Sequence, residues 1–156
     1  MPFDAPFKLG PFMVDSEGRL WPGEPEAAPG FLFRWHDRVV RARLAQADAA
    51  HGRIILQAAV ARVPSTASTP DGTLRPRTFA LLRWLEKSVP AGWRVSLLAD
   101  HRVWLESDRM IAMPITAAAL MTEITCFLLE LAPHLDLLDE SGLTTLAAGA
   151  AVPEAA

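Results

Sequence analysis

The four histidines have the most versatile chemistry in this sequence, because imidazole can transfer protons and bind metals near neutral pH. They are His36, His51, His101 and His134. Two of them have a neighbouring acid, in the pairs His36-Asp37 and Asp100-His101. A carboxylate beside an imidazole could orient it for proton transfer. Both pairs fall at expected hairpin tips, where Asp and His also occur for conformational reasons, so we interpret them as turns.

Other catalytic groups are scarce. The single cysteine, Cys126, is expected on the apolar face of a helix beside Phe127 and Leu128, as a buried structural thiol. The sequence has no zinc-ligand spacing, no glycine-rich phosphate loop and no G-x-S-x-G turn. A metal site would require the histidine turns to converge on a carboxylate. We therefore predict no catalytic, cofactor-binding or metal-binding residues and no cofactor.

The charged residues are unevenly distributed. Residues 1–78 hold ten Lys and Arg against eight Asp and Glu, whereas residues 79–156 hold five against ten. The basic bias centres on Arg34, Arg38, Arg41, Arg43, Arg53 and Arg62. Such a set can be the solvated face of a sheet or a patch for an acidic partner. The carboxylates Glu106 and Asp108, and the pair Asp139-Glu140, are expected to be solvent-exposed near the ends of elements.

Composition and charge exclude several classes of protein. The chain has 156 residues, 51% of them hydrophobic and 21% charged, which is typical of one globular domain. Its net charge of −3 argues against a nucleic-acid partner. The N-terminus lacks the basic and apolar regions of a signal peptide, and the apolar stretches are short for a membrane span. We expect a cytoplasmic protein with no membrane partner.

The elements that must position these residues begin with strands. Residues 1–30 are proline-rich and extended, with a short hairpin formed by 12–14 and 19–21. Strict alternation over 31–35 and 39–44, followed by a β-branched run over 54–63, predicts an antiparallel meander. Residues 64–76 are expected to be an exposed loop.

The second half alternates between helix and hairpin. Thr78 is expected to cap a helix over 79–88, followed by strands at 93–98 and 102–106 and a further strand at 108–113. Thr116 is expected to cap a last helix that Pro133 interrupts. The sequence thus predicts a single α+β domain over 1–142, in which two main helices pack on one face of an antiparallel sheet made of a meander plus a hairpin. Residues 143–156 are expected to form a disordered, Ala-rich tail.

Large aromatic residues suggest where the core and the interfaces lie. Four of the five tryptophans are expected in or near the core: Trp35, Trp84, Trp93 and Trp104. We expect Phe31, Phe33 and Trp35 on the sheet face that the helices leave uncovered. A twofold contact with a second copy would cover this face, which predicts a homodimer.

The segment from Thr78 to Leu138 resembles the fold of type III secretion chaperones and the related YbjN-like bacterial proteins. The likeness lies in the order of a helix (Phe79 to Leu85), a hairpin (Val95 to Leu105) and a long helix after Pro114-Ile115-Thr116. The resemblance implies a homodimer that binds a non-native or extended segment of a partner protein, without catalysis. Two alternatives stay open. One is a small-molecule-binding protein or enzyme with a pocket between sheet and helices and Asp100-His101 as its polar group. The other is an accessory subunit that uses its arginines on an acidic partner.

Overall fold

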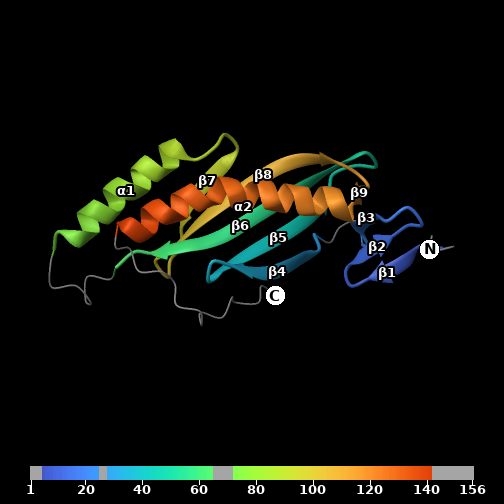
Figure 1. The fold of residues 1–156 in the computed structure, drawn as a ribbon, viewed down its shortest axis with the longest axis horizontal. Helices are drawn as coiled ribbons and strands as arrows, with labels where there is room; N and C mark the ends of the chain where they lie inside the picture. Colours follow the sequence, from blue (N-terminus) through green and yellow to red (C-terminus); the bar gives the residue numbers. More distant parts are fainter. Residues whose placement is uncertain (1–4, 25–27, 65–71, 142–156) are drawn as a thin grey trace.

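The structure is a computed structural model that describes residues 5–24, 28–64 and 72–141 (Figure 1). It confirms the α+β class, with antiparallel strands and two helices. In chain order the elements are β1 (Phe7–Leu9), β2 (Phe12–Val14), β3 (Arg19–Pro22), β4 (Gly30–Trp35), β5 (Arg38–Gln46), β6 (His51–Arg62), α1 (Leu74–Ser88), β7 (Trp93–Leu97), β8 (Arg102–Ala112), β9 (Ile115–Thr116) and α2 (Ala117–Glu140).

Five of the strands form the main sheet, in the order β4-β5-β6-β8-β7. Val40, Ala42 and Leu44 alternate with half-buried neighbours along β5, which is the period-two pattern of a strand with one face in the core. His36 and Asp37 join β4 to β5, with φ angles of 47° and 60°. Two consecutive residues with positive φ are the signature of a tight hairpin turn, so the predicted turn is confirmed. The expected strand at 108–113 is part of the long β8.

A second, small sheet has the order β1-β2-β3-β9 and lies at one end of the molecule (Figure 1). Its central hairpin, β2–β3, was predicted from the sequence. Asp15 shapes the turn, since its carboxylate accepts hydrogen bonds from the backbone N–H groups of Glu17 and Arg19, both at 2.9 Å. Strand β9 pairs Ile115 with Leu20 and so joins this sheet to the start of α2.

Helix α2 begins where it was predicted to begin, but it ends later than predicted. The hydroxyl oxygen of Thr116 accepts a hydrogen bond from the N–H of Ala119 at 3.1 Å, a standard N-cap. Pro133, however, does not end the helix, which continues to Glu140. Leu131, Leu135 and Leu138 are buried on both sides of the proline. Their packing offsets the backbone hydrogen bond that a proline inside a helix removes.

Helix α1 begins earlier than predicted. Leu74 is its first residue and Thr73 occupies the N-cap position, whereas Thr78, the expected cap, lies inside the helix and is buried. Pro76 falls in the first turn, where a helix needs no N–H from it. The expected loop therefore ends before residue 74, and 65–71 lie outside the described residues, as does the expected tail at 143–156.

The core lies between the main sheet and α2, which runs along one face of it (Figure 1). Phe127 is 1% exposed, and its ring stacks on that of Trp93 in β7, with the centroids 4.8 Å apart. Leu85 of α1 is completely buried in the same core. Trp104 is buried as expected and Trp35 is half-buried, but Trp84 is 51% exposed on α1, so its assignment to the core was wrong.

The aromatic residues of β4 lie on the face opposite to the expected one. Directly paired residues of antiparallel strands share a face, and Phe31 and Phe33 pair with the buried residues Ala42 and Val40. They therefore lie at the edge of the helix-covered face. The argument for a dimer through Phe31, Phe33 and Trp35 on an uncovered face is wrong, because the register of β4 against β5 could not be derived from the alternation alone.

His134 makes the stability of the fold sensitive to mildly acidic pH. It lies on α2, and its ring centroid is 6.3 Å from that of Trp93. Burial lowers the pKa of His134 below its ordinary value of 6.5. Below about pH 6.5 the unfolded chain then binds more protons than the folded one, so stability is unaffected by this group above that pH and is lost as the pH falls from there through the lowered pKa of His134.

We expect the free energy of unfolding to fall more steeply in the native protein than in His134→Gln when the pH drops from about 7.5 to about 5.5. Urea denaturation of both proteins at the two pH values measures this difference. Equal changes in the two proteins would show that His134 does not contribute.

Candidate interaction surfaces

The histidine turns are accounted for by local structure. Asp100 accepts a hydrogen bond from the backbone N–H of Arg102 at 3.1 Å and also pairs with the guanidinium of that residue. His101 has a φ of 66° and occupies the tip of the β7–β8 hairpin. At the other tip, the ring of His36 lies 4.2 Å from that of Trp35. The Asp100 carboxylate therefore already has its bonding partners within the β7–β8 turn.

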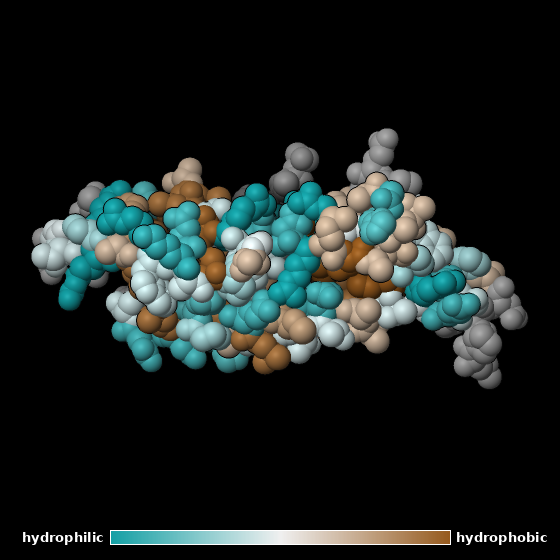
Figure 2. Space-filling model, turned by 90° about the horizontal axis from the view of Figure 1, so that it is seen from above, coloured by the Kyte–Doolittle hydropathy of each residue, from teal (hydrophilic) through white to brown (hydrophobic). Residues whose placement is uncertain are grey.

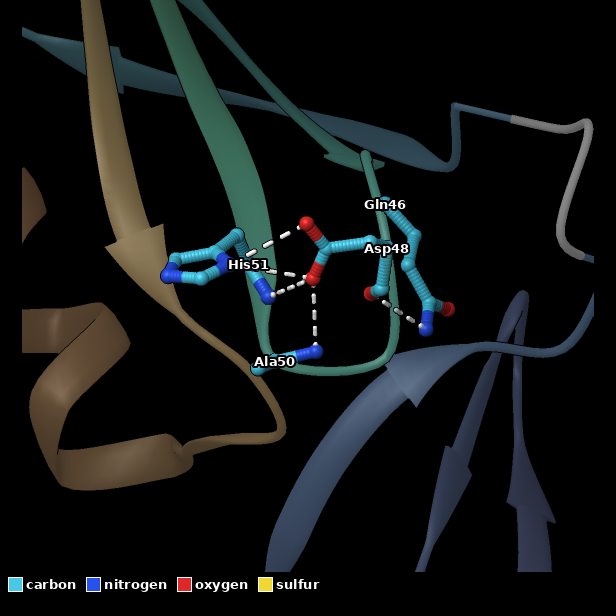
Figure 3. A network of polar contacts seen from close by, with 4 residues as sticks. All are labelled: Gln46, Asp48, Ala50 and His51. Carbon is cyan, nitrogen blue, oxygen red and sulfur yellow. Dashed lines mark hydrogen bonds and ion pairs between the residues drawn. The ribbon is translucent and has the colours of Figure 1, made fainter.

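His51 has the clearest acid partner (Figure 3). Its Nδ1 lies 3.0 Å from an oxygen of Asp48, and the same carboxylate accepts hydrogen bonds from the backbone N–H groups of Ala50 and His51, both at 2.8 Å. The hydrogen bond from Ala50, followed by that from the His51 side chain, lowers the pKa of Asp48. Both side chains are about three-fifths exposed. The pair closes the β5–β6 turn in open solvent, without the enclosure that sites for small ligands show.

The histidines do not converge in the structure. Within the ranges 5–24, 28–64 and 72–141, no group of three His, Cys, Asp or Glu side chains could hold a metal ion. Cys126, expected to be buried, is only partly buried on α2. The described histidines and Cys126 therefore do not form a cluster that suggests a reaction.

The open face is the surface of the main sheet opposite α2. Cross-strand register places on it the side chains of Leu32, Arg34, Arg41, Arg43, Arg53, Ile55, Gln57, Arg62, Arg94, Arg102, Trp104, Glu106, Asp108 and Met110. Glu106 and Asp108 lie inside β8 and are only 16% exposed, which corrects their expected place near the end of an element. Glu106 binds Gln57 and Arg94, and Asp108 binds Arg53.

Three neighbouring arginines of the open face, on β4 and β5, have no such partner. Arg34, Arg41 and Arg43 make no side-chain ion pair or hydrogen bond with the described residues. The face carries seven arginines against two carboxylates, a net charge of +5, on a chain whose net charge is −3. The remainder of the chain therefore carries −8. The arginines of the sequence thus form a localised basic surface, and the guanidinium groups of Arg34, Arg41 and Arg43 have no carboxylate partner among the described residues.

Arg38 does not belong to this surface, although the sequence placed it in the same basic set. It is 5% exposed on the helix-covered face, and its guanidinium lies 2.5 Å from a carboxylate oxygen of Asp139 near the end of α2. It also donates to the carbonyl oxygens of His36 and Val60. Its role is to attach the end of α2 to the β4–β5 hairpin.

The open face also holds a buried indole N–H group, that of Trp104, without a hydrogen-bond partner among the described residues. Trp104 is 9% exposed. The guanidinium of Arg102 lies over its ring, 6.0 Å from the centroid. Buried polar groups without partners are rare in folded proteins. This part of the face is therefore rich in donors and poor in acceptors.

The outer side of α2 is also unusual. From Ala117 to Pro133 its exposed residues carry no charge, and we call them the neutral face: Ala117, Ala118, Ala119, Met121, Thr122, Thr125, Leu129 and Pro133. The acids of this stretch, Glu123 and Glu130, both bind Arg109 of β8, at 3.6 and 2.6 Å. By length and composition α2 could cross a membrane, with a mean hydropathy of 1.3 over 18 residues, yet its inner side lines the core.

Exposed hydrophobic residues are also found elsewhere on the molecule. Figure 2 shows several separate hydrophobic patches between hydrophilic side chains. The described residues include nine large hydrophobic side chains that are exposed, among them Met121 at 58%, Met110 at 63% and Leu129 at 69%. Single exposed hydrophobics are ordinary on a protein surface, whereas large contiguous apolar patches are typical of interaction sites.

The fold and these surfaces define a small α+β protein with helices on one sheet face and a basic surface on the other. Comparisons with family models, with curated proteins and with solved structures found no match to this chain.

Proposed function

We propose that this chain is a non-catalytic, chaperone-like protein-binding module that works as a homodimer in the cytoplasm. The observation that carries the proposal is the neutral face of α2. A helix that covers one side of a sheet normally presents charged residues to solvent on its outer side. Here the exposed residues over nearly five turns, about 3.6 residues each, are only Ala, Met, Thr, Leu and Pro. Such a surface gains stability when another protein removes it from water.

The sequence of the neutral face suits a contact with a second copy. Met121 and Leu129 lie four residues before and after Thr125. If two α2 helices pack antiparallel about a twofold axis at Thr125, Met121 of each copy meets Leu129 of the other. The small side chains of Ala118 and Thr122 allow close approach of the helices, and the flanking acids are neutralised by Arg109 of their own chain. A surface that is complementary to itself is what a twofold contact requires.

We expect the native protein to have twice the chain mass of 17.0 kDa at micromolar concentration. Light scattering after size-exclusion chromatography measures this mass. The variant Met121→Glu with Leu129→Glu should have the mass of one chain, because burying four carboxylates in the contact is unfavourable. Met110→Glu is the control, since Met110 is similarly exposed but lies on the open face.

A dimeric Met110→Glu protein and a monomeric double variant, both with native circular dichroism, would support the proposal. A native protein that is monomeric, or a double variant that remains dimeric, would contradict the homodimer. The partner protein that the resemblance to secretion chaperones implies, the cytoplasmic location and the absence of nucleic-acid and membrane partners remain predictions.

A further inference from the structure

We infer that the open face binds an acidic, extended segment of a partner protein. This inference rests on the proposed protein-binding function and names the chemistry of the partner. Its basis is the set of unpaired arginines. Arg53 and Arg94 already bind Asp108 and Glu106, so their charge is matched within the sheet. Arg34, Arg41 and Arg43 have no carboxylate among the described residues, and they lie close together on β4 and β5.

The spacing of these arginines matches an extended peptide. Arg41 and Arg43 occupy alternate positions of β5, so their Cα atoms are separated by roughly 6.6 Å along the strand. Alternate side chains of another extended chain have the same separation. Arg34 pairs with Val39 and is therefore a diagonal neighbour of Arg41. A segment with carboxylates at alternate positions could pair with Arg41 and Arg43 in succession, through the bidentate geometry that guanidinium and carboxylate groups favour.

Apolar side chains lie between the arginines. Leu32 is opposite Arg41 and is 52% exposed, and Ile55 is opposite Arg43 on the other side of β5. Leu32 and Ile55 can pack against the backbone of a bound peptide and the aliphatic parts of its side chains. The surface therefore combines charge with exposed apolar area, which is typical of sites that bind other proteins.

Charge also decides between a protein and a nucleic acid as the partner. The open face carries +5, whereas the remainder of the chain carries −8. A long polyanion would extend beyond the open face and be repelled by the acidic surface around it. A short acidic segment can be accommodated within the basic area alone. We therefore assign the surface to a protein segment.

The probe is a fluorescent peptide of 12 residues that alternates Glu and Thr, and anisotropy measures its binding to the full chain. The comparison ligands are the matching Gln-Thr and Lys-Thr peptides and a 12-base-pair DNA duplex. The variant Arg41→Gln with Arg43→Gln removes the charge of two central arginines. The variant Arg77→Gln with Arg83→Gln is the control, because it removes the same charge from exposed positions of α1.

We expect the Glu-Thr peptide to bind more tightly than the other three ligands, with an affinity that falls as salt is added. Arg41→Gln with Arg43→Gln should weaken it at least about tenfold, because hydrogen bonds to charged groups contribute strongly. The control variant should change it by less than about twofold.

Several results would overturn the inference. Equal binding of the Gln-Thr peptide, tighter binding of the Lys-Thr peptide, or an equal loss in both variants would show that these arginines do not select acidic segments, although the chain would still bind peptides. DNA binding as tight as that of the Glu-Thr peptide would show a general polyanion site. If no peptide binds, the open face is not a peptide site, and the mass measurement on the α2 variants still decides the dimer independently.

Discussion

Phe127→Ala is expected to lower the free energy of unfolding by about 3–5 kcal/mol, the range found when buried aromatic side chains are truncated. Phe127 is 1% exposed, lies midway along α2 and stacks on Trp93 at 4.8 Å. The substitution removes the contact between the long helix and the strand β7, and it leaves a cavity lined by an indole ring whose N–H already has no acceptor.

Urea denaturation at a fixed protein concentration measures this change, since a dimer would make stability depend on concentration. Phe31→Ala is the control, because it truncates the same side chain at an edge position that is 37% exposed. It should cost about 1 kcal/mol or less. Similar losses in the two variants would contradict the packing described for α2.

The second large effect is expected at the far end of α2. Asp139→Ala should lower the free energy of unfolding by roughly 3 kcal/mol, because it leaves the guanidinium of Arg38 buried without a counter-charge. Arg38 is 5% exposed, whereas the carboxylate of Asp139 is 46% exposed. Water can therefore reach the carboxylate side of the pair, which places the expected loss at the lower end of the range for buried ion pairs.

Two variants test the origin of this loss. Asp136→Ala removes an exposed acid from the same part of α2 and should change stability by less than about 0.5 kcal/mol. Arg38→Met combined with Asp139→Ala removes both charges, and it should be more stable than Asp139→Ala alone. If the combined variant is the less stable one, the hydrogen bonds of Arg38 to His36 and Val60 matter more than its charge.

Regular patterns in the sequence predicted most of the main sheet. Strict alternation located β4 and β5 along the chain, although not the face of β4, and the apolar period of α2 identified Phe127 as a core residue. The strands β1 and β9 were missed because they have three and two residues, too few to show a period. The predicted interruption of α2 at Pro133 and the predicted N-cap at Thr78 were wrong for a different reason. Local preferences for helix ends were overridden by tertiary packing, which buries Leu131 and Leu135 on the two sides of Pro133 and buries Thr78 itself inside α1.

The candidate surface was only partly predictable. The sequence shows which residues are arginines, but the number of charges left unmatched depends on pairs of residues far apart in the chain. Glu106 neutralises Arg94 and Asp108 neutralises Arg53 through the register of β7, β8 and β6. Arg38 alternates with the open-face arginines along β5 and so lies on the helix-covered face, where Asp139, 101 residues away, matches its charge. Nor could the neutral face be recognised before Glu123 and Glu130 were seen to turn toward Arg109.

The pairing of β3 with β9 has a consequence for synthesis on the ribosome. Leu20 is translated 95 residues before its partner Ile115. Until then β1, β2 and β3 form a three-stranded sheet of very short strands, and its buried residues Phe12, Val14 and Leu20 lack the rest of the core, so it has little stability of its own. The amino-terminal strands must therefore wait for the segment before α2, and the small sheet is completed late, when β9 joins β3 next to the N-cap of that helix.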